Sequence, residues 1–178
     1  LEEIDAELVE RVAQNVIAVY DKGGEEHYNL ISALHKAVRN SDVDATLYWL
    51  ARMLEAGEDA RFIVRRMVIF ASEDVGLADS RGLDVAVAAA HALEHVGLPE
   101  AQLNWAQAAI YLATAPKSNR AALAIWNGRA AVRDGATGEV PPHLRDGHYQ
   151  GAAALGHGVG YEYPHDSLSG WVDQEYLP

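Results

Sequence analysis

Residues 27–42, HYNLISALHKAVRNSD, and residues 48–54, YWLARML, decide the fold of this chain. Both runs place apolar residues three and four positions apart, which is the spacing of one face of an α-helix. In the first run the inward residues are Leu30, Ile31, Leu34 and Val38. The pattern predicts two helices packed against each other, the first ending near Arg39.

The second of these helices has clear start and stop signals. Ser41 is the expected N-cap, and Asp44 stands three residues later, where a capping box places its acidic or amide residue. Gly57 is the expected stop, since glycine readily adopts the backbone conformations that end a helix.

The same signals predict five more helices, and no stretch before residue 135 alternates with the period of a strand. These helices are expected over residues 4–20, from Asp59 to about Asp74, from the Gly76–Asp79 turn to Gly97, from Pro99 to before Pro116, and from Ser118 or Asn119 to near Gly135. The fold class predicted is all-α, a bundle of about seven helices.

After Gly135 the sequence changes character. Glycine, proline, histidine and tyrosine dominate, and a short helix around residues 142–155 is the most regular structure expected. An irregular segment of this length is unusual inside a compact domain. Its aromatic residues favour a strap packed on the helices over a disordered tail; they are Tyr149, Tyr161, Tyr163, Trp171 and Tyr176.

Composition limits the functions open to the chain. It has 178 residues, 49% apolar and 22% charged, which is typical of a globular domain. No apolar run approaches the roughly 20 residues of a membrane span. The formal charge of −12 opposes general affinity for nucleic acid, although a local basic face can still act at physiological salt. The absence of cysteine fits a reducing cytoplasm.

One short motif suggests metal chemistry. His91, Glu94 and His95 match the H-x-x-E-H pattern of inverted zinc peptidases, and the two histidines share a helical face. The alternative is an ordinary helix in which His91 lies beside the apolar stripe. No third ligand is identifiable, so zinc hydrolysis is the weaker interpretation, and we expect no metal ligands and no catalytic residues.

Cations with a possible role in binding lie in three places. Arg61, Arg65 and Arg66 cluster on one predicted helix, Lys36 and Arg39 lie at the end of another, and Lys117 and Asn119 precede a helix N-terminus. Each set has a structural explanation, through solvation, the helix dipole or capping, and a functional one, contact with phosphate or an acidic partner.

Several segments together resemble one family across nearly the whole chain. They are Tyr20–Lys22, His27–Asp42, Tyr48–Met53, Gly57–Asp59, Arg65–Arg66, Ala71–Asp79, Ala115–Asn119, His148–Ala152, Leu155–Gly158 and Tyr163–Asp166. In this order they look like the C-terminal half of the RarA/MgsA replication-associated recombination ATPases and the Werner-helicase-interacting proteins. Three positions depart from the usual pattern: Ala37, Asn40 and Ala60 stand where serine, glycine and proline are usual. Asn40 tolerates a left-handed turn, so the pattern survives.

The resemblance implies a function that composition and periodicity do not. Full-length members are AAA+ ATPases that act on DNA at stalled replication forks, in the cytoplasm and associated with the nucleoid, with single-strand-binding protein as a possible partner. The resemblance implies that residues 1–20 trail from the AAA+ lid, that residues 21–134 form a collar that assembles a homotetramer, and that residues 135–178 pack on this collar. It further implies that ATP and magnesium bind the ATPase core, and that this region holds no cofactor and performs no catalysis. The sequence itself contains no G-x-x-x-x-G-K-[ST] nucleotide-binding loop.

Four tryptophans are candidate anchors of such an assembly, with core burial as the alternative for each. They are Trp49, Trp105, Trp126 and Trp171. A third interpretation keeps the helices as a scaffold and makes the aromatic tail a protein-binding adaptor.

Overall fold

A computed structural model describes residues 25–135 and 137–178 of the chain, so the helix predicted over residues 4–20 lies outside the described residues. Every regular element in the described part is helical, which confirms the all-α prediction. None of these helices is long and apolar enough to cross a bilayer. The chain divides into two compact units, residues 1–125 and residues 126–178.

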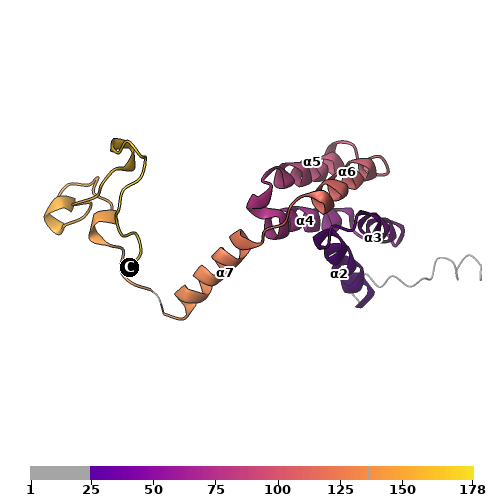
Figure 1. Ribbon diagram of the computed structural model, residues 1–178, viewed down its shortest axis with the longest axis horizontal. Coiled ribbons are helices and arrows are strands. Elements are labelled where there is room, and N and C mark those ends of the chain that lie inside the picture. The colour runs from indigo at the N-terminus through magenta and orange to yellow at the C-terminus, as the bar shows by residue number, and fades with distance from the viewer. Residues whose placement is uncertain (1–24, 136) are drawn as a thin grey trace, which may run out of the picture. The chain divides into compact units, whose positions relative to one another are not determined.

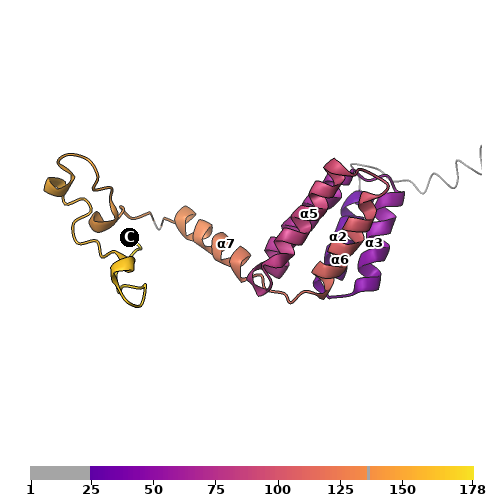
Figure 2. The same cartoon turned by 90° about the horizontal axis from the view of Figure 1, so that it is seen from above.

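The first unit is a helical bundle (Figure 1). It contains α2 (Glu25–Arg39), α3 (Val43–Glu55), α4 (Ala60–Phe70), α5 (Arg81–His95) and α6 (Ala101–Thr114). Consecutive helices α2 and α3 pack together, as do α5 and α6, and α6 also packs on α2 and α3 (Figure 2). The sixth helix, α7 (Arg120–Arg133), begins in this unit and crosses the division between the two units.

The core is centred on α6. Trp105 and Leu112 are almost completely buried there, and the alanines between them let neighbouring helices approach closely. The indole N–H of Trp105 donates a hydrogen bond to the backbone carbonyl of Ala89 at 3.2 Å, so its one polar group is satisfied inside the core.

The start of α3 differs from the prediction by one residue. Asp42, not Ser41, is the N-cap, and its carboxylate accepts a hydrogen bond from the backbone N–H of Ala45 at 2.9 Å. Ser41 has φ of 60°, in the left-handed region, while Asp42 has the extended backbone that a cap requires. The left-handed residue in this turn is therefore Ser41, next to Asn40.

The helix predicted to run to Asp74 changes type on the way. α4 ends at Phe70, and a π-helical turn, Ala71–Val75, and a short 3₁₀ helix, Gly76–Ala78, follow it. Gly76 has φ of 51°, and a Cβ placed on it would lie 2.6 Å from the carbonyl oxygen of Ser118. Only glycine fits here without displacing backbone.

Two more predicted boundaries move. α6 begins at Ala101 instead of Pro99, because the hydrogen bonds of its first turn include two of the three-residue type, from Gln102 N–H to Pro99 and from Leu103 N–H to Glu100. In the second unit the helix expected over residues 142–155 is replaced by two 3₁₀ turns, Pro142–Leu144 and Ala152–Leu155. Gly151, with φ of 90°, precedes the second turn in a conformation no α-helix contains.

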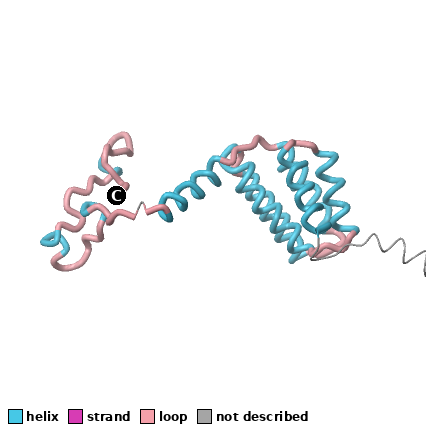
Figure 3. Tube along the Cα trace, turned by 90° about the horizontal axis from the view of Figure 1, so that it is seen from below, coloured by secondary structure: helices cyan, strands magenta, loops and turns pink. Residues whose placement is uncertain are grey.

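Apart from the end of α7, the rest of the described second unit consists of loops and one further 3₁₀ turn, Pro164–Asp166 (Figure 3). Its hydrogen bonds join distant segments: the backbone N–H of Gly158 donates to the carbonyl of Pro142 at 2.9 Å, and the amide of Gln174 donates to the carbonyl of Gly160 at 2.7 Å. Irregular backbone here is held by such links instead of by a helical ladder. Packing of the tail on the helical domain stays a prediction.

Candidate functional site

Three segments far apart in sequence meet at one end of the bundle. They are the last turn of α2 with the residues that follow it, the π-helical turn after α4, and the loop of residues 115–119 after α6. All three belong to the segments that carry the family resemblance. We refer to this place as the α2–π-turn junction.

The centre of the junction is a two-point ion pair. Arg39 donates from Nε to Oδ1 of Asp74 at 2.6 Å and from Nη2 to Oδ2 at 3.1 Å. The Asp74 side chain is only 10% exposed, whereas that of Arg39 is 50% exposed. The hydrogen bond that Arg39 donates to Asp74, together with the negative charge of Asp74, raises the pKa of Arg39 above its already high value despite opposition from burial. The pair therefore holds the end of α2 against the π-turn.

Lys117 ties the loop after α6 into the same junction. Its Nζ donates to the carbonyls of Ala113 and Ala115 at 2.9 and 2.6 Å and to Oγ of Ser41 at 3.2 Å. The two carbonyls belong to the last turn and the C-cap of α6, where a cation is favoured. Burial lowers the pKa of Lys117, and the charge of Asp74 partly offsets this. The backbone N–H of Ser118 completes the junction by donating to the carbonyl of Asp74 at 2.7 Å.

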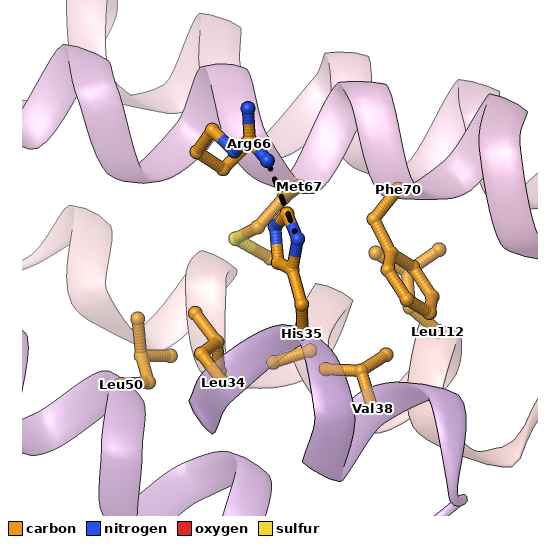
Figure 4. A pocket seen from close by; sticks show the side chains of 9 residues that line it. Leu34, His35, Val38, Leu50, Arg66, Met67, Phe70 and Leu112 are labelled. Atoms are coloured by element: carbon orange, nitrogen blue, oxygen red, sulfur yellow. Dashed lines mark hydrogen bonds between the residues drawn. The ribbon is translucent and has the colours of Figure 1, made fainter. Parts of the chain in front are cut away.

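A second polar contact lies deeper between α2 and α4. Nη2 of Arg66 lies 3.4 Å from Nδ1 of His35 (Figure 4). Because a guanidinium can only donate, Nδ1 is the acceptor and Nε2 carries the imidazole proton. Burial, together with the charges of Arg66 and Arg39, lowers the pKa of His35 to about 4, against a smaller opposing effect of Asp74. His35 is therefore neutral at pH 7.

This contact borders a cavity too small for a ligand. The cavity measures about 10 Å³, against several hundred for a typical ligand pocket. Besides His35 and Arg66 it is lined by apolar residues from α2, α3, α4 and α6: Leu34, Val38, Leu50, Met67, Phe70, Ala109 and Leu112. Nε2 of His35 and Nε of Arg66 are buried and have no hydrogen-bond partner among the described residues. We therefore interpret the contact as a feature of packing.

The structure separates the cations grouped in the sequence. Arg61 and Arg65 are exposed on α4, with the Arg65 guanidinium 5.5 Å from the ring centre of Phe62, whereas Arg66 turns inward to His35. Lys36 and Asn119 are exposed. Arg39 and Lys117 are engaged within the junction. Arg61 and Arg65 thus face solvent, whereas Arg39, Arg66 and Lys117 have partners within the bundle.

The four tryptophans have different surroundings. Trp105 is fully buried, so for this residue the core alternative holds and it has no surface to offer a partner. Trp49 is half-buried, with Tyr48 and the guanidinium of Arg52 against its ring. Trp126 and Trp171 are 48% and 67% exposed. Trp126 and Trp171 are thus more exposed than the other two tryptophans.

The zinc interpretation finds no ligand set. His91, Glu94 and His95 are exposed on α5, where a helix gives two histidine ligands at most. Across residues 25–135 and 137–178, no three histidine, cysteine or acidic side chains come together to hold a metal.

The second unit has an open depression of its own, with a volume of about 670 Å³. Its lining includes Tyr149, whose hydroxyl lies 2.7 Å from Nδ1 of His157, and Arg145, which donates to Glu139 at 2.8 Å. The charged groups that line it are largely paired with one another. We assign it no chemistry.

Sequence reasoning missed the partners at the junction, namely Asp74, Ser41 and His35. Their signal was present in part, since all three lie inside segments that resemble the family. Nothing in the local sequence, however, shows that Asp74 lies opposite Arg39, 35 residues earlier.

Comparison with known proteins assigns the chain to a family. The model of the MgsA AAA+ ATPase C-terminal family matches residues 40–178, and that of the AAA C-terminal domain matches residues 1–39. The chain belongs to the MgsA AAA+ ATPase C-terminal family. All three segments of the junction contribute residues to the region matched by this family model.

The similar proteins include an AAA domain-containing protein, a replication-associated recombination protein and an ATPase. The chain is 52% identical over 175 residues to an uncharacterized AAA domain-containing protein of Mycobacterium tuberculosis, covering 98% of this chain and 39% of that protein. It is 45% identical to the replication-associated recombination protein A of Bacillus subtilis, covering 98% and 41%, and 46% identical to the ATPase WRNIP1 of Dictyostelium discoideum, covering 93% and 19%. The chain thus spans about two fifths, or less, of the length of these relatives.

Proposed function

We propose that this chain is the assembly and docking domain of a DNA-dependent AAA+ ATPase that acts in replication-associated recombination at stalled forks. The observation that carries the proposal is the match of residues 40–178 to the MgsA C-terminal family, whose members here include proteins named for replication-associated recombination. The bundle itself offers structure and surface, and we assign it no bond-making step.

In this proposal the chemistry belongs to the rest of the protein. ATP and magnesium bind the ATPase core, DNA is engaged by the full-length protein, and the protein acts in the cytoplasm at the nucleoid. Single-strand-binding protein is the further partner we propose. Any phosphate contact made by this domain we assign to the exposed Lys36, Arg61, Arg65 and Asn119, because Arg39, Arg66 and Lys117 have partners inside the bundle.

The assembly we propose is a homotetramer formed by this domain. It is tested by the mass of the purified 178-residue chain, measured by light scattering and sedimentation equilibrium at tens of micromolar. A mass four times that of the 19.3 kDa chain is expected. A monomer at this concentration overturns the proposal.

A second candidate function is a protein-binding adaptor that uses the tail. It is favoured by one observation, the exposure of aromatic residues in the second unit, with Trp171 67% exposed and Tyr163 53% exposed. Deletion of residues 135–178 distinguishes the two functions. Tetramers that survive the deletion support assembly through helices and leave the tail for a partner, whereas loss of the tetramer assigns the tail to assembly.

DNA contact by this domain has its own test. Phosphate contacts release counterions, so binding of a single-stranded oligonucleotide must weaken as salt rises. Binding that does not respond to salt excludes phosphate contact through Arg61 and Arg65. The double variant Arg61→Ala, Arg65→Ala is the matched comparison, since both side chains are exposed.

A further inference from the structure

Two neighbouring helices of the first unit, α2 and α4, concentrate positive charge on an acidic chain. α4 carries Arg61, Arg65 and Arg66 and no acidic residue, and α2 carries Lys36 and Arg39 after its acidic first turn. The whole chain has 14 basic and 26 acidic residues, so this excess of cations is local. Within the described residues, Arg39 alone among these five cations has a carboxylate partner.

α2 and α4 lie side by side and run in the same direction. At the start of α2, His27 binds Glu58, which comes just before α4. Two turns later His35 contacts Arg66, and Figure 4 shows these two side chains facing each other. Both pairs are 31 residues apart, so positions along the two helices advance in step.

A chain of side-chain contacts crosses from α2 to α4. The ring centres of Tyr28 and His27 are 5.0 Å apart, the ring of Phe62 lies 4.5 Å from that of His27, and the guanidinium of Arg65 lies 5.5 Å from the Phe62 ring centre. Ile69 is one turn beyond Arg65 on the same side of α4. Tyr28, Arg65 and Ile69 are exposed, and Phe62 is half-buried. We call Tyr28, Phe62, Arg65 and Ile69 the α2–α4 strip.

The strip combines an exposed cation with apolar surface. Arg65 can bind a carboxylate through two parallel hydrogen bonds, and no carboxylate of the described residues pairs with it. Lys36, two steps of four residues after Tyr28 on α2, adds a second exposed cation. Tyrosine and arginine are enriched at the energetic centres of protein interfaces. A complementary partner is therefore acidic and partly apolar.

The dimensions of the strip suit a short segment of chain. From Tyr28 to Lys36, α2 rises by about 12 Å, which about four residues of extended chain span. Carboxylates lie beyond both ends of α4, since Asp59 caps its start and Glu73 lies in the π-turn after its end. A strand of nucleic acid that continues past either end meets like charges, whereas a short acidic peptide fits between them.

We propose that the α2–α4 strip binds a short, extended, acidic segment of a partner protein. Carboxylates of the segment bind Arg65 and Lys36, and an apolar side chain of the segment packs on Tyr28 and Phe62. The proposal rests on the docking part of the function proposed above and gives the chemistry of what docks. It requires no contact between copies of this chain.

The test selects ligands without assuming the partner. Random peptides of about seven residues, slightly longer than the strip, are displayed on phage and selected on the 178-residue chain. The enriched peptides are expected to be acidic and to contain a large apolar residue. For the tightest peptide, Arg65→Glu should raise the dissociation constant at least about tenfold, and Tyr28→Ala at least about fivefold. Binding should also weaken as salt rises.

Arg81→Glu is the matched control, because Arg81 is an exposed arginine of the same unit on a different helix, α5. It should change the dissociation constant by less than about twofold. Thermal unfolding checks that each variant is folded, and Arg65→Gln replaces Arg65→Glu if the charge reversal unfolds the chain. A selection that enriches no acidic peptide overturns the proposal, as do acidic peptides that bind the Arg65 variant as tightly as wild type.

Other results assign the strip to a different ligand. A single-stranded oligonucleotide that binds more tightly than every selected peptide, and that the Arg65 variant no longer binds, overturns the proposal in favour of nucleic acid. A lower assembly mass in the Arg65 variant overturns it in favour of a contact between copies. A monomeric wild type overturns the homotetramer proposed above but leaves the affinity of the strip for acidic peptides standing, so the two failures are distinguishable.

Discussion

Arg39, the last residue of α2, binds both carboxylate oxygens of Asp74 across 35 residues of sequence, with Nε 2.6 Å from Oδ1 and Nη2 3.1 Å from Oδ2. Asp74 lies in the π-helical turn, so this pair joins the end of α2 to a segment whose Ala71 and Val75 are buried in the core. Two segments that carry the family resemblance thereby meet in space, and Ser118 adds the third by donating to the carbonyl of Asp74.

Loss of this pair should destabilise the bundle. Arg39→Ala leaves the Asp74 carboxylate mostly buried without its arginine, and hydrogen bonds to charged groups contribute about 1.5–3 kcal/mol. Because Arg39 is half exposed, we expect a loss of about 2 kcal/mol in the free energy of unfolding by urea. Lys36→Ala, an exposed cation on the same helix, is the control and should change it by less than about 0.5 kcal/mol. Equal losses from Arg39→Ala and Lys36→Ala would show that the Arg39–Asp74 pair contributes nothing to the free energy of unfolding.

His35 should make stability depend on pH. Its pKa is lowered from 6.5 to about 4 in the folded chain, so the unfolded chain binds a proton first as pH falls. The stabilisation is fully present above pH 6.5 and is lost as pH falls toward 4. Between pH 7 and pH 4.5 wild type should lose about 2 kcal/mol more than His35→Gln, whose side chain does not titrate. Parallel curves for the two proteins in urea unfolding would show that His35 is not the titrating group.

Gly76 should not tolerate a side chain. Gly76→Ala forces a Cβ to 2.6 Å from the backbone carbonyl of Ser118, in addition to the cost of a positive φ. Gly57→Ala is a matched control, since Gly57 also has a positive φ, of 73°, but open space around the new Cβ. We expect about 1 kcal/mol for Gly57→Ala and at least about 3 kcal/mol for Gly76→Ala in thermal unfolding. Similar costs would mean that the loop after α6 moves freely away from the turn.

Truncation of Trp105 and of Trp171 should change the free energy of unfolding by different amounts, because the two side chains differ in burial. Trp105→Ala empties the centre of the core and should cost about 3–5 kcal/mol in urea unfolding, as large core truncations do. Trp171→Ala removes a side chain that is 67% exposed and should cost less than about 1 kcal/mol. A large loss from Trp171→Ala would show that the tail is packed more firmly than its exposure indicates.

Local sequence patterns predicted the helices well because their causes are local. Periodic apolar residues, capping side chains and glycine stops act within a few residues of where they stand, so α2 to α7 lie close to the predicted ranges. The errors occur where two local options compete. Ser41 and Asp42 are both good caps, and the backbone of the turn decided between them. The π-turn after Phe70 has no signal in the apolar period, because its stabilising partners lie in α2 and after α6.

The candidate site was less predictable because the partners of its residues lie in distant segments of the sequence. Arg61, Arg65 and Arg66 share a short stretch, but the packing of α4 on α2 sends only Arg66 inward to His35. Likewise, Lys117 before a helix N-terminus is expected to attract an anion, whereas in the structure it binds the last carbonyls of the preceding helix.

The amino-acid order alone therefore determined the helical class, the approximate ends of the helices and membership in one ATPase family, since each rests on patterns of neighbouring residues. Tertiary structure alone decided that Arg39 binds Asp74, that Lys117 closes α6 and that Trp105 is buried. Such pairings depend on which helix surfaces meet, and that depends on the packing of the whole bundle and on no single segment.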